Sequence, residues 1–262
     1  MNYEPNIIET DLDWKSPRTL RASTSEIVIH HAAINTASVY DVHNFHLNST
    51  VENFIGIAYN FYIRKDGSIY EGRGWDYVGG HTSNHNSVSV GICCEGYYHY
   101  DNNGYTQGPP NAQLTSLIKM VAKAMEKYSL NIDDVYGHYE LNSTACPGNL
   151  FPLEEVKDAA AVYSDVDTAC ARLLNKGVID SPEYWVNCYW QLANLDTLLI
   201  RLGNMCTYDT NGRVYTSINS ALTQLVSAGV IDSPDYWRNN YTEIQYLGDL
   251  IKSAASHTEI IY

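Results

Sequence analysis

The chain lacks several features that would assign it to a common class. No apolar run approaches the ~20 residues needed to cross a bilayer, so we expect no membrane insertion. Basic residues are few: 16 Lys and Arg stand against 30 Asp and Glu, for a net charge of −14 at pH 7. Because phosphate binding needs Lys and Arg, this balance argues against nucleic acid as the partner.

Targeting and framework motifs are also missing. Residues 1–5 have no basic segment and no hydrophobic stretch after them, so we expect no signal peptide, synthesis in a cytoplasm, and action outside only after release. The six cysteines show no disulfide spacing and are expected to be reduced. No HExxH motif supplies a glutamate general base. Tyrosine is abundant, with 22 residues, which suits a surface that binds sugars but is also ordinary surface composition.

The first part of the chain mixes strand and helix patterns. An Asp66-Gly67 turn between two strand patterns predicts a hairpin. Apolar residues at 3- and 4-residue steps predict a helix from Leu114 to Tyr128. The remaining patterns predict strands over residues 26–31, 57–63, 68–70 and 87–94 and a helix over residues 38–47. This mixture predicts an α/β domain over residues 1–160.

The last hundred residues contain a repeat instead of strands. Residues 177–185, Gly-Val-Ile-Asp-Ser-Pro-Glu-Tyr-Trp, return almost unchanged as residues 229–237, 52 positions later. Each copy predicts a helix, a glycine stop, a serine cap with proline at the first helical position, and another helix. We therefore expect residues 164–262 to form a small all-α domain of two repeats that pack on each other.

A set of potential metal ligands is distributed along the first domain. His138 and Cys146 are eight positions apart, and a third donor is offered by His30 or His31 at the end of a predicted strand. Two imidazoles and one thiolate form a zinc site that leaves a fourth position open, which is typical of catalysis. Side chains alternate along a strand, so only one of the two adjacent histidines can face this site. The alternatives are structural histidines and a small cysteine buried at a Pro-Gly turn.

Four segments of the first domain resemble the zinc N-acetylmuramoyl-L-alanine amidases, the family of T7-type lysozyme and the peptidoglycan recognition proteins. They are the strand ending in His30-His31, the tyrosine strand and hairpin over residues 57–75, the Gly79–Ile92 loop and strand, and the Gly137–Gly148 segment. The resemblance implies a mixed central sheet flanked by helices. It implies that His30, His138 and Cys146 bind one zinc ion.

The same resemblance assigns roles to three further residues. Tyr59 matches the active-site tyrosine, Thr144 stands where relatives have Lys or Thr, and His81 lies in the substrate-side loop. Tyr59 and Thr144 are expected to be catalytic, and Tyr59 and His81 to bind substrate. The alternatives are a half-buried strand aromatic for Tyr59, a turn-stabilising hydroxyl for Thr144, and a groove-shaping residue for His81.

The resemblance implies a peptidoglycan hydrolase that cuts between N-acetylmuramic acid and L-alanine, most simply a phage endolysin. A bacterial autolysin or sporulation amidase and a non-catalytic peptidoglycan-binding protein are the alternatives. The helical repeats are expected to bind the cell wall, including a secondary wall polymer, or to form a homo-oligomer. Candidate contacts are Tyr184, Trp185, Tyr236, Trp237 and Trp190, although the Tyr-Trp pairs also fit the core of each repeat.

Overall fold

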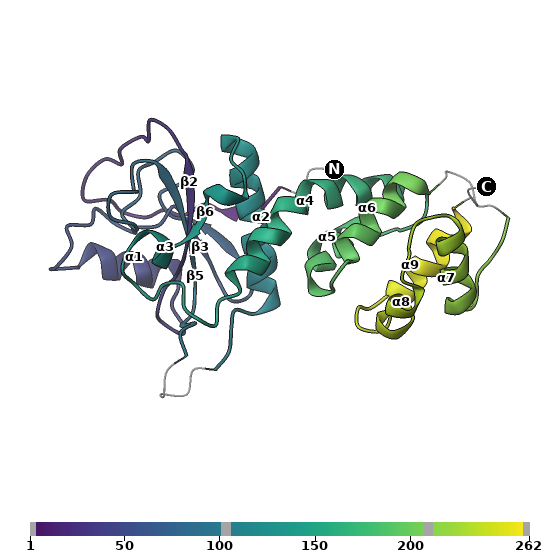
Figure 1. Cartoon of the computed structure of the whole chain (residues 1–262). Helices are drawn as coiled ribbons and strands as arrows, with labels where there is room; N and C mark the ends of the chain where they lie inside the picture. Colours follow the sequence, from purple (N-terminus) through teal and green to yellow (C-terminus); the bar gives the residue numbers. More distant parts are fainter. Residues whose placement is uncertain (1–3, 101–105, 207–211, 259–262) are drawn as a thin grey trace. The chain divides into compact units, whose positions relative to one another are not determined.

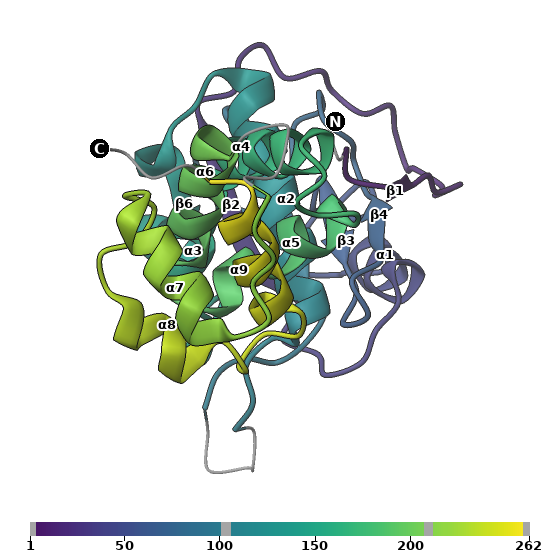
Figure 2. The ribbon, with the colours of Figure 1, turned by 90° about the vertical axis from the view of Figure 1, so that its right-hand side faces the viewer.

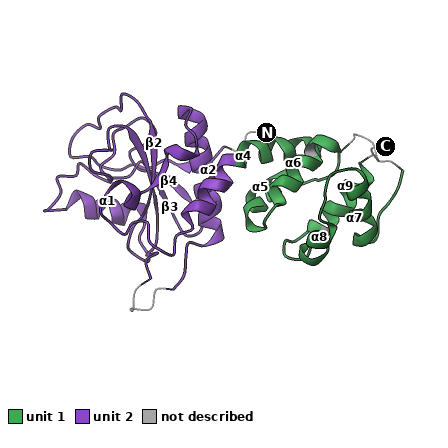
Figure 3. Cartoon of the chain, viewed as in Figure 1, with its two compact units in different colours: residues 1–3, 162–262 green, residues 4–161 purple. Residues whose placement is uncertain are grey.

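The computed structural model describes residues 4–100, 106–206 and 212–258. The chain divides into two compact units between residues 161 and 162 (Figure 3). This division falls inside helix α4 (Leu153–Asn175), and the limits of 160 and 164 expected from the sequence lie on either side of it. The first unit contains a sheet with helices, whereas the described part of the second unit is entirely helical.

The first unit is built on one mixed sheet, as predicted (Figure 1). Its strands are β1 (Ile7–Ile8), β2 (Glu26–His31), β3 (Phe61–Ile63), β4 (Ile69–Glu71), β5 (Ser89–Cys94) and β6 (Val135–Gly137). Their order across the sheet is β1-β4-β3-β5-β2-β6. Neighbouring strands are parallel except in the β3–β4 hairpin, which turns at Asp66-Gly67 as predicted.

Helices cover both faces of this sheet (Figure 1). The helical elements are α1 (Val39–Leu47), α2 (Asn111–Tyr128), the short 3₁₀ helix η1 (Ile132–Asp134) and α3 (His138–Leu141). Helix α1 starts at a Ser38 cap and packs Val39 and Val42 against Tyr62 and Cys93. Helix α2 contacts β3 and β5. The amphipathic spacing in the sequence therefore predicted both helices correctly.

The predicted strand over residues 57–63 is shorter than expected. Only Phe61–Ile63 pair as a strand, because residues before it bond elsewhere. The backbone N–H groups of Ile57 and Ala58 donate to the ring nitrogens of His43 and His46 on α1, each at 3.2 Å. Both histidines are buried. Side chains of a distant helix thus replace the strand partners that alternation predicted.

Strand register determines what reaches the edge of the sheet. Strands β2 and β6 are parallel neighbours, with Ile29 opposite Gly137, so the next residues along each strand lie side by side. In the pairing of β2 with β5, His30 lies opposite Cys93. His30 therefore shares the α1 face of the sheet with Cys93, and His31 belongs to the opposite face. His30 and His31 are the last two residues of β2 and lie at the carboxyl edge of the sheet, where α/β sheets bind ligands.

Six further helical elements lie in the described part of the second unit. They are α5 (Pro182–Cys188), the 3₁₀ helix η2 (Tyr189–Gln191), α6 (Leu195–Met205), α7 (Ile218–Ser227), α8 (Pro234–Asn240) and α9 (Leu247–Ser256). Helix α7 contacts both α8 and α9 (Figure 2). Trp185 and Trp237 are buried in this unit, whereas Tyr184, Tyr236 and Trp190 are half-buried. The two tryptophans of the repeats are therefore core residues, and of the Tyr-Trp pairs only the tyrosines reach the surface.

The described residues show neither disulfide bonds nor a membrane-spanning helix. All six cysteines are unpaired thiols. None of the helices within the described ranges combines the length and apolar character that crossing a membrane requires.

Candidate metal centre and active site

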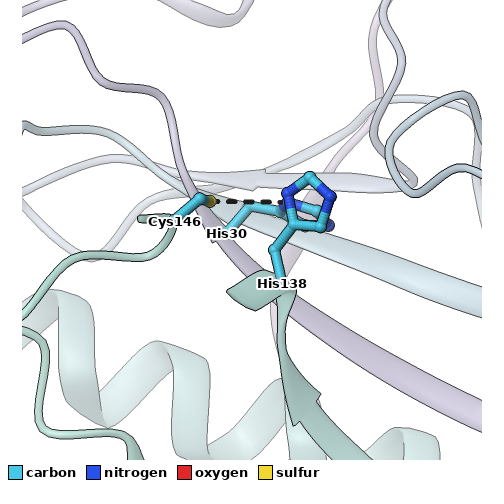
Figure 4. A group of neighbouring side chains, drawn as sticks. All are labelled: His30, His138 and Cys146. Carbon is cyan, nitrogen blue, oxygen red and sulfur yellow. Dashed lines mark hydrogen bonds between the residues drawn. The ribbon is translucent and has the colours of Figure 1, made fainter. Parts of the chain in front are cut away.

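Three potential ligands from separate parts of the sequence meet at the carboxyl edge of the sheet (Figure 4). His30 ends β2, His138 follows β6 directly, and Cys146 comes from the loop after α3. One donor atom of each lies within 4.8 Å of the others, and the Cys146 Sγ is 3.6 Å from His30 Nδ1. The geometry selects His30 rather than His31 for this cluster.

Each histidine of the cluster is held by a side chain behind it. His30 Nε2 lies 3.0 Å from His81 Nδ1, and His138 Nε2 lies 3.2 Å from Asn142 Oδ1. With these nitrogens engaged, the Nδ1 atom of each histidine is left to face Cys146. Such outer partners fix the tautomer and orientation of metal-binding imidazoles.

The protonation states of the cluster follow from its burial. Burial holds the pKa of His30 well below its ordinary value, and repulsion from His81 and His138, were those rings protonated as well, lowers it further. Burial also lowers the pKa of His138. In contrast, burial raises the pKa of the Cys146 thiol to about 12, against a hydrogen bond from the His31 backbone that lowers it. Without a cation the set is therefore two neutral imidazoles and one neutral thiol.

The cysteine loop is tied to its surroundings by backbone bonds. The His31 N–H donates to Cys146 Sγ at 3.4 Å, and the Tyr139 N–H donates to the Cys146 carbonyl at 2.8 Å. Thr144 is exposed, and its Oγ1 accepts the Cys146 N–H at 3.3 Å. The turn-stabilising contact considered for Thr144 is therefore present, and the hydroxyl proton is still available for another acceptor.

Tyr59 lies beside the cluster. Its ring centroid is 5.2 Å from that of His30, and the side chain is half-buried. Burial raises the pKa of Tyr59 well above its ordinary value, and the neighbouring Cys93 and Cys146 raise it further. The phenol therefore keeps its proton at neutral pH and can act as a hydrogen-bond donor.

His81 lies next to His30, on the side away from Cys146. It is 7 % exposed and packs behind His30, where its Nδ1 also lies 2.8 Å from the Thr82 hydroxyl. Gly79 and Gly91 leave room for the ring, since a Cβ at either position would overlap it. Burial lowers the pKa of His81 to about 3, so the ring is neutral. This contact makes His81 a positioning residue for His30, whereas the predicted substrate contact stays a prediction.

Asn142 and Asn60, which hold parts of the site in place, were not predicted from the sequence. Asn142 stands four positions after His138, a spacing at which helical side chains meet, so this signal was present. Asn60 has no such local signal. It is fully buried, donates to the Gly74 and Tyr77 carbonyls at 2.8 Å each, and accepts the Gly91 N–H at 2.9 Å. It thereby connects the sheet to the loop that precedes His81.

The first unit is similar to proteins of a known family. The family model described as N-acetylmuramoyl-L-alanine amidase matches residues 21–149, within the first unit. Peptidoglycan-recognition protein SC2 of Drosophila simulans is 34% identical over 142 residues, which cover 51% of this chain and 73% of that protein. The endolysin of Klebsiella phage KP32 is 29% identical over 129 residues, or 49% and 83% of the two chains.

A solved structure gives the same result. The endolysin LysCS, an N-acetylmuramoyl-L-alanine amidase from Clostridium intestinale URNW, superposes with a TM-score of 0.54 at 34% identity, over 60% of this chain and 97% of that one. The predicted family, fold class and enzyme class are thereby confirmed. The chain belongs to the N-acetylmuramoyl-L-alanine amidase family, which also includes peptidoglycan recognition proteins and phage endolysins.

Proposed function

We propose that this protein is a zinc-dependent peptidoglycan amidase that hydrolyses the bond between N-acetylmuramic acid and the L-alanine of the stem peptide. The observation on which this proposal rests is the convergence of His30, His138 and Cys146 on one point of an amidase fold. Relatives that only bind peptidoglycan are expected to lack a complete ligand set, so the full set favours an enzyme over a binding protein.

The donor set fits a zinc ion. Two imidazole nitrogens and one thiolate satisfy the ligand preference of zinc and leave one of four tetrahedral positions for water or substrate. Both imidazoles are neutral, as ligation requires, and Cys146 would bind as the thiolate after losing its proton. When bound there, zinc supplies a Lewis acid that polarises the amide carbonyl and lowers the pKa of water to about 7.

The protein itself contributes hydrogen-bond donors to the reaction. The negative charge that develops on the amide oxygen needs a donor, and Tyr59 keeps its phenolic proton beside His30. Thr144 provides a second hydroxyl two residues before Cys146. We assign Tyr59 and Thr144 to the stabilisation of this charge, and Tyr59 also to the transfer of a proton to the leaving amine.

The positions of the ligands are maintained by neutral residues behind them. With a metal on Nδ1 of each imidazole, His30 Nε2–H would donate to His81 Nδ1 and His138 Nε2–H to Asn142 Oδ1. Neither partner introduces a charge that would compete for the cation. The site is therefore pre-organised before any ion or substrate arrives.

The biological role that we propose is that of a phage endolysin, made in the host cytoplasm and active at the wall after release. The similarity to the Klebsiella phage and Clostridium endolysins supports this role. A bacterial autolysin would use the same chemistry, and an adjacent holin gene would favour the endolysin. The second unit is proposed to bind the wall, and its self-association stays a prediction.

A wall-clearing assay with product analysis tests the function. Purified sacculi should lose turbidity, and each cleavage should release one new L-alanine amino terminus, which amine labelling and peptide sequencing identify. A chelator should stop both signals, and added zinc should restore them. Clearing with new reducing sugar ends but no new amino termini would assign the protein to another hydrolase class, and no clearing would leave only a binding protein.

A further inference from the structure

The two repeats of the second unit have matching backbones. Gly177 and Gly229, 52 positions apart, both adopt a φ of +71° at the end of a helix. Asn194 and Tyr246, also 52 apart, both adopt left-handed conformations, with φ of +64° and +65°. The two copies are therefore the same local structure formed twice.

The repeats also contact each other reciprocally. The Tyr184 hydroxyl of the first copy donates to the Gln245 carbonyl of the second at 2.9 Å. The Tyr236 hydroxyl of the second copy donates to the Ala193 carbonyl of the first at 2.6 Å. Tyr184 and Tyr236 are 52 positions apart, and so are Ala193 and Gln245, which means that one contact is made twice by exchanging the copies. Each copy thus completes a surface cavity on the other.

The two resulting cavities differ in size, and one of the positions at which their linings differ is a serine in the first and an arginine in the second. In the first cavity, Ser253 donates to the Val178 carbonyl at 2.9 Å. At the equivalent place in the second cavity, Arg201 donates to the Val230 carbonyl at 3.2 Å. The first cavity has a volume of about 900 Å³ and the second about 260 Å³. The long arginine side chain occupies space that the serine leaves open.

The open cavity presents aromatic faces. Tyr246 is 57% exposed, and its ring meets that of Tyr184 edge to face with centroids 5.6 Å apart. A left-handed backbone is unfavourable for a bulky side chain and much better tolerated by asparagine, which the other copy has as Asn194. An exposed tyrosine held in this conformation points to a role in binding rather than in stability.

The polar groups of the open cavity are mainly hydrogen-bond acceptors. Asp180, Glu183 and Asp249 line it with exposed carboxylates, and none of the described lining residues is Lys or Arg. Lys252 lies outside this lining and pairs with Asp249 at 2.8 Å. Carboxylates accept from hydroxyl groups and repel phosphates. Apolar aromatic faces beside acceptors fit a neutral sugar and not an anionic wall polymer.

We propose that this open cavity, bounded by Tyr184, Tyr246, Asp180, Asp249 and Ser253, binds an uncharged N-acetylated sugar of the peptidoglycan glycan strand. The smaller cavity, which has Arg201 and Asn194 where the open cavity has Ser253 and Tyr246, binds none. This inference rests on the proposed function only for the choice of the wall as the source of the sugar. A unit that binds the glycan without its stem peptides would keep the enzyme on the strand after cleavage.

Binding by the full chain tests this inference. Every binding variant includes Cys146→Ser, so that no cleavage occurs during the assay. The probes are sacculi stripped of phosphate-linked polymers by hydrofluoric acid, and uncharged oligosaccharides of N-acetylglucosamine, which carry neither phosphate nor stem peptide. Ser253→Arg should fill the cavity as Arg201 fills its counterpart, and Tyr246→Asn removes the aromatic face while placing a residue suited to the backbone. Each should weaken binding roughly tenfold at unchanged thermal midpoint.

Arg201→Ser is the matched control and should not weaken binding. Both cavity variants, with Cys146 restored, should still cleave a soluble muropeptide like the wild type. A wild-type protein that does not cleave the muropeptide would contradict the proposed amidase function but not the proposed binding site. The inference is overturned if both folded variants bind as tightly as the parent. It is also overturned if the parent protein binds neither the stripped sacculi nor the uncharged oligosaccharides.

Discussion

Zinc binding should release close to one proton per ion, nearly all of it from Cys146. Burial raises the pKa of this thiol from its ordinary 9.0 to about 12. Forming the thiolate therefore costs about 4 kcal/mol more than in an exposed cysteine, and zinc binding must supply this energy. His30 and His138 should contribute little, because burial lowers the pKa of both imidazoles.

Titration calorimetry of zinc into the metal-free protein measures the number of protons released per ion. The apparent enthalpy is recorded at pH 6.5 in buffers of different ionisation enthalpy, and its slope gives the protons released. This pH lies below the value of about 7 at which water on a zinc ion ionises. The apparent affinity for zinc should also rise about tenfold for each unit of pH around pH 6.5, because one proton leaves for each ion bound.

A second buried cysteine gives a matched control. Burial raises the pKa of Cys170 to about 12 as well, but this residue lies in the second unit, outside the ligand cluster. Cys170→Ala should leave the proton count and the affinity unchanged. A release near zero in the wild type, or a count that falls in the Cys170 variant, would refute the assignment of Cys146 as the ligand that ionises.

Three further outcomes follow from the structure. Tyr59→Phe should stay folded by circular dichroism and lose about 10²–10³-fold in turnover; near-normal turnover would remove its hydroxyl from the reaction. His81→Ala should weaken zinc binding about 10–100-fold by competitive chelation, because His30 loses its partner, and an unchanged affinity would contradict the positioning role. Burial raises the pKa of Glu95, but Arg64 and backbone N–H groups more than offset this and leave it below its ordinary value, so Glu95→Gln should make the fold less stable at pH 7. A carboxyl whose pKa is lowered in the folded state stabilises the fold above its ordinary pKa near 4.5. Denaturant titrations should therefore find the stability difference between wild type and Glu95→Gln at pH 7 and lose it as the pH falls through the folded-state pKa. A stability difference that does not change with pH would contradict this role of Glu95.

Elements with strong local signals were predictable from the sequence. Strand β2 and helix α2 follow from apolar spacing, and the Ser38 cap and the prolines before Asn111 set the starts of their helices. Strand β3 was predicted too long, because the N–H groups of Ile57 and Ala58 bond to α1 histidines that alternation cannot reveal. Local sequence pattern predicts an element well where its backbone hydrogen bonds form within the helix or sheet. It fails where distant side chains accept those hydrogen bonds instead.

The ligand cluster was predictable only in part. The family resemblance named His30, His138 and Cys146, while strand alternation alone left His30 and His31 equivalent. The pairing of β2 with β5 and β6 distinguishes them, and this register is a property of the folded sheet. The place of His81 behind His30 depends on a loop folded over two glycines, for which the sequence offers no periodic signal.

Metal analysis of the purified protein beside its Cys146→Ser variant tests the central claim most directly. The account predicts about one zinc ion per wild-type chain and very little in the variant, because removal of a thiolate leaves two imidazoles that hold zinc weakly. A variant that retains one zinc ion per chain, or a wild-type protein that holds none after exposure to zinc, would contradict the assignment of His30, His138 and Cys146 as the metal site.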